Sequence, residues 1–169
     1  MKLRLLILLL LISNFIFSQK AFENWDKNYI LSNPENIINA EIDYAKNIEK
    51  DTTQGHFYVA MSKFRFLAEF TGNKRPIDST VFYSMKVVLK VKLGSSEALN
   101  GLVSQEFEFD IGESKIWMPI QNPLIEDFEK EVKKGDKVLL YTLFTNEHKF
   151  KGGIINTFLI SEFATKWTE

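Results

Sequence analysis

The chain has 169 residues, of which 45% are hydrophobic, with 22 acidic and 21 basic residues and no cysteine. This nearly neutral charge argues against a nucleic-acid partner, which requires a basic surface. The absence of cysteine excludes disulfides and cysteine-based metal sites. Fifteen Phe and three Trp residues can instead fill one hydrophobic core by burial alone.

The first 18 residues have the pattern of a cleavable secretory signal peptide. Lys2 and Arg4 make the start positive, an apolar run of about 13 residues follows, and Ser18 offers a small residue before the cleavage point. This run is shorter than the roughly 20 residues that cross a bilayer, and the alternative is an uncleaved signal anchor. Removal of residues 1–18 leaves one domain, 19–169, with 19 basic and 22 acidic residues. We therefore expect a periplasmic or secreted protein without a membrane span.

Two helices are predicted in the front of this domain, over residues 34–71. Pro34 suits the first turn of a helix, and apolar residues at helical spacing predict that helix over 34–50. Apolar residues three and four apart predict a second helix over 56–71. The same segment also alternates apolar and polar residues over 63–70, which is typical of a strand, so that strand remains the alternative.

The most regular pattern lies at 80–93, where every odd position from 81 onward is apolar. Period two over this length predicts a long strand with one buried face. Residues 103–111 repeat the alternation, with acidic residues at even positions 106, 108 and 110. In an antiparallel hairpin whose paired numbers sum to 196, the lysine row would meet the acidic row and the apolar faces would match. That register sets Leu89 by Phe107, Lys90 by Glu106 and Lys86 by Asp110.

Further elements are predicted in the last third of the chain. Strands are expected over 115–120, 137–145 and 154–163, with a polar turn over 146–153. Asn122 and Pro123 favour the start of a helix, and Gly135 favours its end. The strand at 137–145 is apolar on both faces, which indicates a central place in the sheet.

The long strand and the run from Ile116 through Asn122-Pro123 and Gly135-Asp136 to Phe144 define an order of elements over 80–163. This order, three strands, a helix and two strands, resembles the OB-fold, a five-stranded and partly open barrel. The resemblance implies an α+β domain in which two N-terminal helices precede a five-stranded antiparallel OB-like barrel, with a helix between strands three and four. The alternative is a cone-shaped fold similar to the NTF2-like family, in which helices precede a curved sheet.

The OB-fold resemblance also implies where a ligand would bind, at the face of strands two and three and at the loops after strands one and four. Here these are the region 94–101, Trp117 and the loop 146–152. The candidate ligand or partner contacts are therefore Trp117, Asn146, His148 and Phe150. Trp117 can stack on a sugar or a peptide, with packing as the simpler interpretation, and an exposed Phe150 at a loop tip would suit a contact site.

Little else in the sequence points to chemistry. His56 and His148 are the only histidines, and no metal site, cofactor motif or catalytic motif is recognisable. Three carboxylates on one face of 103–111 would be spaced about 6.8 Å apart, which glycoside hydrolysis could use, but pairing with lysines explains them as well.

The sequence therefore favours a non-catalytic exported domain, without a cofactor, that binds an unidentified protein or saccharide partner. One alternative is an NTF2-like small-ligand pocket protein or enzyme, with the apolar face of 80–93 lining its cavity. Another is an accessory component of an exported assembly.

Overall fold

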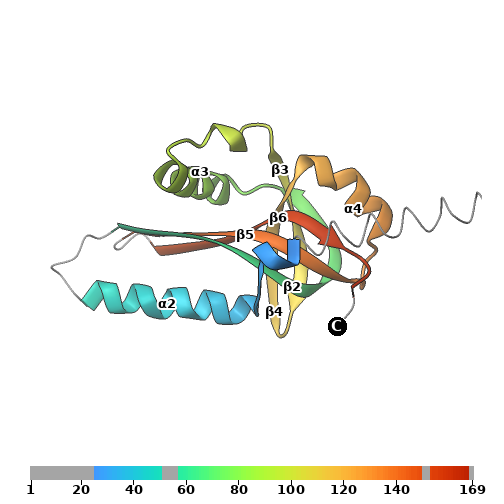
Figure 1. The fold of residues 1–169 in the computed structure, drawn as a ribbon, viewed down its shortest axis with the longest axis horizontal. Coiled ribbons are helices and arrows are strands. Elements are labelled where there is room, and N and C mark those ends of the chain that lie inside the picture. The colour runs from blue at the N-terminus through green and yellow to red at the C-terminus, as the bar shows by residue number, and fades with distance from the viewer. Residues whose placement is uncertain (1–24, 51–56, 150–152, 168–169) are drawn as a thin grey trace, which may run out of the picture.

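The computed structural model describes residues 25–50, 57–149 and 153–167. The expected signal peptide and the candidate Phe150 lie outside this described part. In chain order the elements are β1 (Ile30–Leu31), α2 (Pro34–Lys50), β2 (Phe57–Pro76), α3 (Ser79–Leu93), η1 (Glu97–Leu99), β3 (Val103–Ile111), β4 (Ser114–Gln121), η2 (Asn122–Leu124), α4 (Ile125–Glu131), β5 (Lys137–Lys149) and β6 (Gly153–Ala164) (Figure 1). None of these helices is long and apolar enough to cross a membrane.

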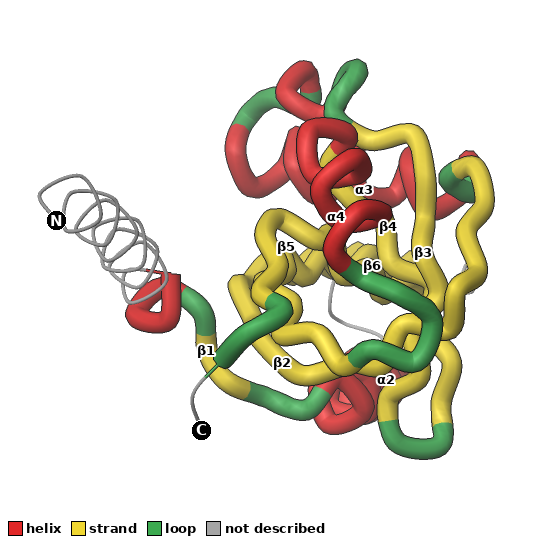
Figure 2. Tube along the Cα trace, turned by 90° about the vertical axis from the view of Figure 1, so that its right-hand side faces the viewer, coloured by secondary structure: helices red, strands yellow, loops and turns green. Residues whose placement is uncertain are grey.

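One six-stranded sheet forms the body of the molecule. Its order is β1-β2-β3-β4-β6-β5, and an additional pairing of β2 with β5 closes five of the strands into a ring (Figure 2). The seams of the ring are uneven, because β2 and β5 pair along 57–69 and 137–149, whereas β4 and β6 meet in parallel at Ile120 and Ile160. The α+β class is thus confirmed, although the ring is not a regular barrel.

Beyond the ring, β2, β5 and β6 extend as a ribbon between two helices, with α2 on one side and α3 on the other (Figure 1). The prediction of a helix over 34–50 is confirmed by α2. The helix predicted over 56–71 is wrong, because this segment belongs to β2. Its alternation was the better signal: Phe66, Ala68 and Phe70 are buried in the ring interior. The ring therefore begins at residue 57 and not at 80, and only one of the two predicted front helices exists.

The strand predicted over 80–93 is also wrong, because this segment is the helix α3. Asp78 caps its start, since Asp78 Oδ1 accepts hydrogen bonds from the backbone N–H of Thr80 at 2.7 Å and of Val81 at 3.4 Å. Gly94 ends the helix in the left-handed conformation, with φ of 80°, and its N–H donates to the carbonyl of Lys90. These two caps are helix signals that the period of two concealed.

Burial along α3 follows the helical period. Apolar residues occupy so many positions of this segment that the sequence fits both the strand period of two and the helical period of 3.6. Met85, Val88 and Leu89 are buried, whereas three members of the alternating set, Tyr83, Val91 and Leu93, are exposed. Met85 and Leu89 pack against Leu159 of β6.

The predicted hairpin between 80–93 and 103–111 is absent, and β3 pairs with β2 and β4 instead. Glu106 lies opposite Arg75 on one side and Pro119 on the other. Lys86 and Lys90 lie on the helix α3 and not on a neighbouring strand. The acidic residues of β3 therefore pair with other residues than the predicted lysines. Asp110, for example, forms an ion pair with Lys115 at 3.5 Å.

The remaining strand predictions are confirmed at 103–111, 115–120, 137–145 and 154–163. The strand β5 pairs with both β2 and β6, as its two apolar faces indicated. It also continues to Lys149, so the turn predicted over 146–153 is wrong for residues 146–149. The predicted late helix exists as η2 and α4, and it ends at Glu131 rather than next to Gly135.

Aromatic side chains fill the interior of the ring. Phe128 of α4 is fully buried, and its ring centroid lies 5.3 Å from that of Phe70, 5.1 Å from that of Phe107 and 5.0 Å from that of Phe163. Edge-to-face pairs of this kind stabilise a core beyond the area that they bury. The helix α4 thereby closes one end of the ring.

Candidate functional site

The outer face of β2, β3 and β4 carries an unusual group of polar and aromatic side chains. Phe107 and its neighbour on the same side, Phe109, are fully buried inside the ring, so the alternate residues Glu106 and Glu108 lie on the outer face. The outer-face cluster consists of Arg75, Glu106, Glu108 and Trp117. Arg75 lies opposite Glu106 and Trp117 lies opposite Glu108 in the strand register.

Arg75 is held on two sides. Its Nε donates a hydrogen bond to Glu106 Oε2 at 2.8 Å, and its guanidinium carbon lies 4.2 Å from the centre of the Trp117 ring, a cation–π contact. The Arg75 side chain is 42% exposed, whereas the Glu106 side chain is 1% exposed. Within the described part of the chain, no residue hydrogen-bonds to the two Nη groups. The guanidinium is therefore fixed in orientation and still offers donors to solvent.

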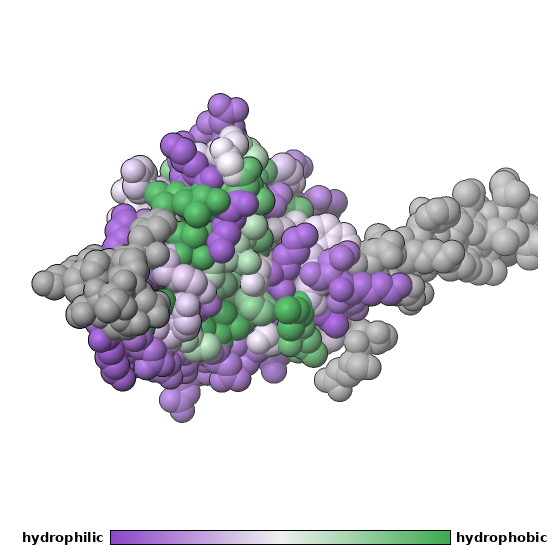
Figure 3. All heavy atoms as spheres, turned by 60° about the vertical axis from the view of Figure 1, so that its left-hand side comes forward, coloured by the Kyte–Doolittle hydropathy of each residue, from purple (hydrophilic) through white to green (hydrophobic). Residues whose placement is uncertain are grey.

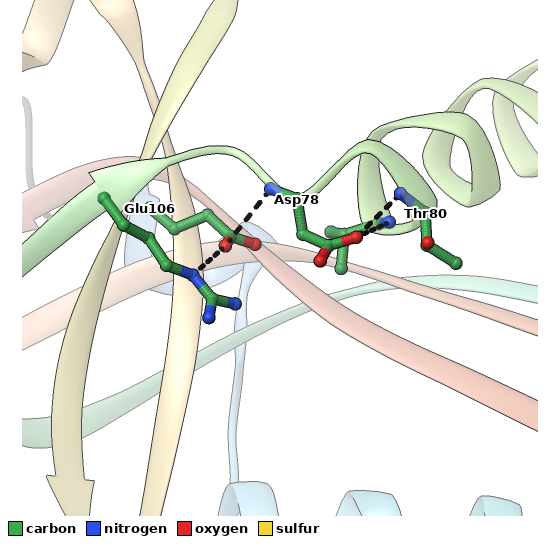
Figure 4. A network of polar contacts seen from close by, with 5 residues as sticks. Asp78, Thr80 and Glu106 are labelled. Atoms are coloured by element: carbon green, nitrogen blue, oxygen red, sulfur yellow. Dashed lines mark hydrogen bonds and ion pairs between the residues drawn. The ribbon is translucent and has the colours of Figure 1, made fainter.

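Glu106 is a buried carboxylate that links the sheet to α3. Its Oε2 also lies 3.4 Å from the backbone N of Asp78, which in turn caps the helix at Thr80 (Figure 4). Hydrogen bonds from the backbone of Thr80 and Val81 lower the pKa of Asp78. Glu106 Oε1 is buried and has no hydrogen-bond partner among the described residues. The ion pair with Arg75 therefore provides most of the interaction that offsets the cost of burying the Glu106 carboxylate.

Glu108 is also tied to protein groups. Its Oε2 accepts hydrogen bonds from Asn73 Nδ2 at 2.8 Å and from Thr71 Oγ1 at 2.9 Å. The Asn73 bond and then the Thr71 bond lower the pKa of Glu108 below its ordinary value. Glycoside hydrolysis needs one carboxyl group with a raised pKa as its acid. The pKa of Glu108 is shifted in the opposite direction, so Glu108 does not suit that role.

An open hollow adjoins the outer-face cluster. It has a volume of about 400 Å³, and its lining consists of Lys74, Arg75, Pro76, Ser104 and Gln105. Lys74 is engaged with Glu129 of α4, at 2.6 Å between Nζ and Oε1. Of the two cations that line the hollow, Arg75 is the one whose Nη groups still offer hydrogen-bond donors. A polar group of a ligand in the hollow can reach them.

The structure places the predicted contact residues in two different regions. Trp117 lies in the outer-face cluster, beneath the Arg75 guanidinium. Asn146 and His148 lie on β5 and not in a loop, and both are buried. Since β6 runs between β4 and β5 in the sheet, these two residues do not join Trp117 in one site.

Asn146 and His148 belong to a polar interface between α2 and the sheet. His148 Nε2 lies 2.9 Å from Glu49 Oε1 of α2, and Asn146 Nδ2 donates to Asn156 Oδ1 at 2.7 Å. In the described residues, three buried polar atoms here lack a hydrogen-bond partner: Glu41 Oε2, Asn146 Oδ1 and His148 Nδ1. Burial raises the pKa of Glu41. No group of three His, Asp or Glu side chains in this part of the chain could hold a metal ion.

Arg75 is the functional candidate that the sequence reasoning missed. It lies between the elements predicted over 56–71 and 80–93. The apolar alternation ends at Phe70, and the pairing of β2 with β3 shifts register between Phe70 and Lys74, so no local pattern marks Arg75. No family model, curated protein or solved structure matches the chain. The function is therefore argued from the site, because a fold by itself does not determine function.

Proposed function

We propose that this chain is an exported, non-catalytic binding domain that contacts a protein or saccharide partner through the outer face of β3 and β4. The observation that carries the proposal is Arg75, which Glu106 and Trp117 hold in one orientation while its Nη groups stay open. A donor that is already ordered loses little conformational entropy on binding, which favours affinity. Export rests on the pattern of residues 1–18.

The connectivity of the ring supports this location of the site. Along the chain the ring strands are β2, β3, β4, β5 and β6, with α4 between the third and the fourth. Their order around the ring, with the parallel pairing of β4 and β6, resembles that of the OB-fold, in which the second and third strands bind ligands. Those strands are β3 and β4 here, and they carry Glu106, Glu108 and Trp117. The helix α3 is an addition to the OB-fold pattern.

The chemistry of the cluster suits a polar, uncharged or weakly acidic ligand group. The Arg75 Nη groups can donate to the hydroxyls of a saccharide, to a peptide carbonyl or to a single carboxylate. Glu106, Glu108 and Asp110 lie along the same strand and would repel a polyanion, so nucleic acid remains an unfavourable partner. No step of this binding requires a cofactor.

The proposal is tested by screening the exported protein against a glycan array and a library of short peptides. Arg75→Ala is expected to weaken binding to the selected probe by about tenfold or more, the equivalent of one charge-assisted hydrogen bond. Arg65→Ala is the matched control, because Arg65 lies on the same strand and pairs with Asp26 at 2.6 Å but is not in the cluster. A probe that binds Arg75→Ala and the unmodified protein equally well would contradict the proposal.

A second candidate is a small-ligand site between α2 and the sheet. The buried polar atoms without hydrogen-bond partners on Glu41, Asn146 and His148 favour it. Buried polar atoms normally have such partners, and a small polar ligand between α2 and the sheet would supply them. A metabolite library that raises the melting temperature of Arg75→Ala but not of His148→Ala would support this candidate. The reverse result would support the outer-face cluster.

A further inference from the structure

The outward face of α3 exposes apolar side chains along its length. Tyr83, Val91 and Leu93 are 63%, 55% and 63% exposed. Val87 is half-buried and lies one turn from both Tyr83 and Val91, so these three residues form a continuous stripe. Figure 3 shows apolar surface gathered over α3, above the ribbon of strands. The opposite side of α3 already packs on the sheet, and the outer stripe contacts the sheet only where Lys149 Nζ of β5 lies 5.8 Å from the centre of the Tyr83 ring, among the described residues.

Every charged residue of α3 is basic. Lys86, Lys90 and Lys92 lie within it, and Ser79–Leu93 contains no Asp or Glu. At 3.6 residues per turn, Lys86 and Lys90 project between Leu93 on one side and Tyr83 on the other. Lys86 and Lys90 therefore lie within the apolar face, whereas Lys92 lies on the far side of the helix. We call this combined surface, with Tyr83, Lys86, Val87, Lys90, Val91 and Leu93, the α3 ridge.

We propose that the α3 ridge docks on an anionic phospholipid bilayer, with α3 lying flat in the interface. The apolar stripe would enter the boundary between headgroups and acyl chains, and the lysines would contact lipid phosphates. The helix has 15 residues, so this is surface contact and not insertion across the membrane. The inference is independent of the site at Arg75.

The placement of the lysines favours lipid over the other possible occupants. Lys90 lies in the middle of the ridge, so a dry groove of a partner protein would have to desolvate its ammonium group. In a bilayer interface, lysine and tyrosine heads remain among phosphates and water while their stems contact apolar surface. A second copy of the chain is disfavoured, because pairing two α3 ridges would oppose lysine to lysine.

Sedimentation of the exported protein with vesicles tests the proposal. We expect binding to mixed phosphatidylglycerol–phosphatidylcholine vesicles, little binding to phosphatidylcholine vesicles, and a decrease as salt is added. The double variant Lys86→Glu with Lys90→Glu should lose about tenfold or more in vesicle affinity. Lys130→Glu with Lys137→Glu is the matched control, because both lysines are exposed and lie away from α3. Equal vesicle affinity of the two double variants, or no binding to either vesicle at low salt, overturns the proposal.

A second measurement reports the depth of the ridge directly. Since the chain has no cysteine, Val91→Cys can carry a single polarity-sensitive fluorophore, with Lys130→Cys as the control. A blue shift of emission on phosphatidylglycerol-containing vesicles, confined to the Val91→Cys label, supports the docking. If the label shifts only in the presence of a purified protein partner, the ridge is a protein interface and the lipid proposal is wrong.

Discussion

Replacement of Arg75 by alanine tests whether the outer-face cluster is held together by a formed ion pair. Breaking a fully buried pair by removing one partner costs about 3–5 kcal/mol, because a buried charge is left without compensation. Glu106 is 1% exposed, but Arg75 is 42% exposed, so water can reach the space that the guanidinium leaves. This reduces the expected loss to about 1.5–3 kcal/mol. Loss of the contact with Trp117 adds about 0.5–1 kcal/mol.

A double-mutant cycle with Glu106→Gln isolates the contribution of the pair. The substituted amide is neutral and nearly isosteric with the carboxylate, so Arg75→Ala in that background should remove much less stability. We expect a coupling energy of about 1–2 kcal/mol between Arg75 and Glu106. Urea unfolding near neutral pH, followed by tryptophan fluorescence and circular dichroism, measures the four free energies of unfolding.

Lys74→Ala provides the control for this cycle, because its pair with Glu129 is exposed on both sides and should contribute at most about 1 kcal/mol. A coupling energy between Arg75 and Glu106 below about 0.3 kcal/mol would mean that the two residues act independently. That result would refute the fixed orientation of Arg75 and, with it, the main support for the proposed binding face.

Two further predictions concern the core and the interface under α2. Phe128→Ala should lower the free energy of unfolding by about 3–5 kcal/mol, because Phe128 is fully buried among the rings of the closed end; a loss below about 1 kcal/mol in urea unfolding would contradict that packing. Glu41→Gln should raise stability near neutral pH and have no such effect at about pH 4. Burial raises the pKa of Glu41 in the folded chain, so the native protein loses stability as the pH rises through that pKa, and the variant does not. Unfolding curves measured across this pH range check the sign, and a constant difference would contradict it.

Local sequence patterns predicted the elements correctly where a single hydrophobic period fitted the segment and the residues at its ends agreed with that period. The helix α2 begins at the Pro34 that the sequence indicated, and β3 keeps the alternation of apolar and acidic residues. They failed over 57–93, where apolar residues are so frequent that periods of two and of 3.6 both fit. There, α3 followed its caps at Asp78 and Gly94, and β2 followed its hydrogen bonds to β5, about eighty positions further along the chain.

The candidate site was predictable only in its parts. The sequence predicts Trp117 as a contact residue, but it pairs Glu106 with Lys90. The structure pairs Glu106 with Arg75, because β2 and not 80–93 is the neighbour of β3. For Asn146 and His148 the sequence predicts a loop, since the polar character of this segment suits a turn. The continuation of β5 and the cover of α2 bury them instead.

The sequence alone determined the α+β class and the segments that become α2, β3, β4, β5 and β6, because each depends on the spacing of residues close together in the chain. Only the tertiary structure decided which strand lies beside which. It therefore decided that the Arg75 guanidinium covers Trp117 and pairs with the buried carboxylate of Glu106. Such pairings join residues far apart in sequence, and their free energy depends on how the whole ring closes rather than on any local period.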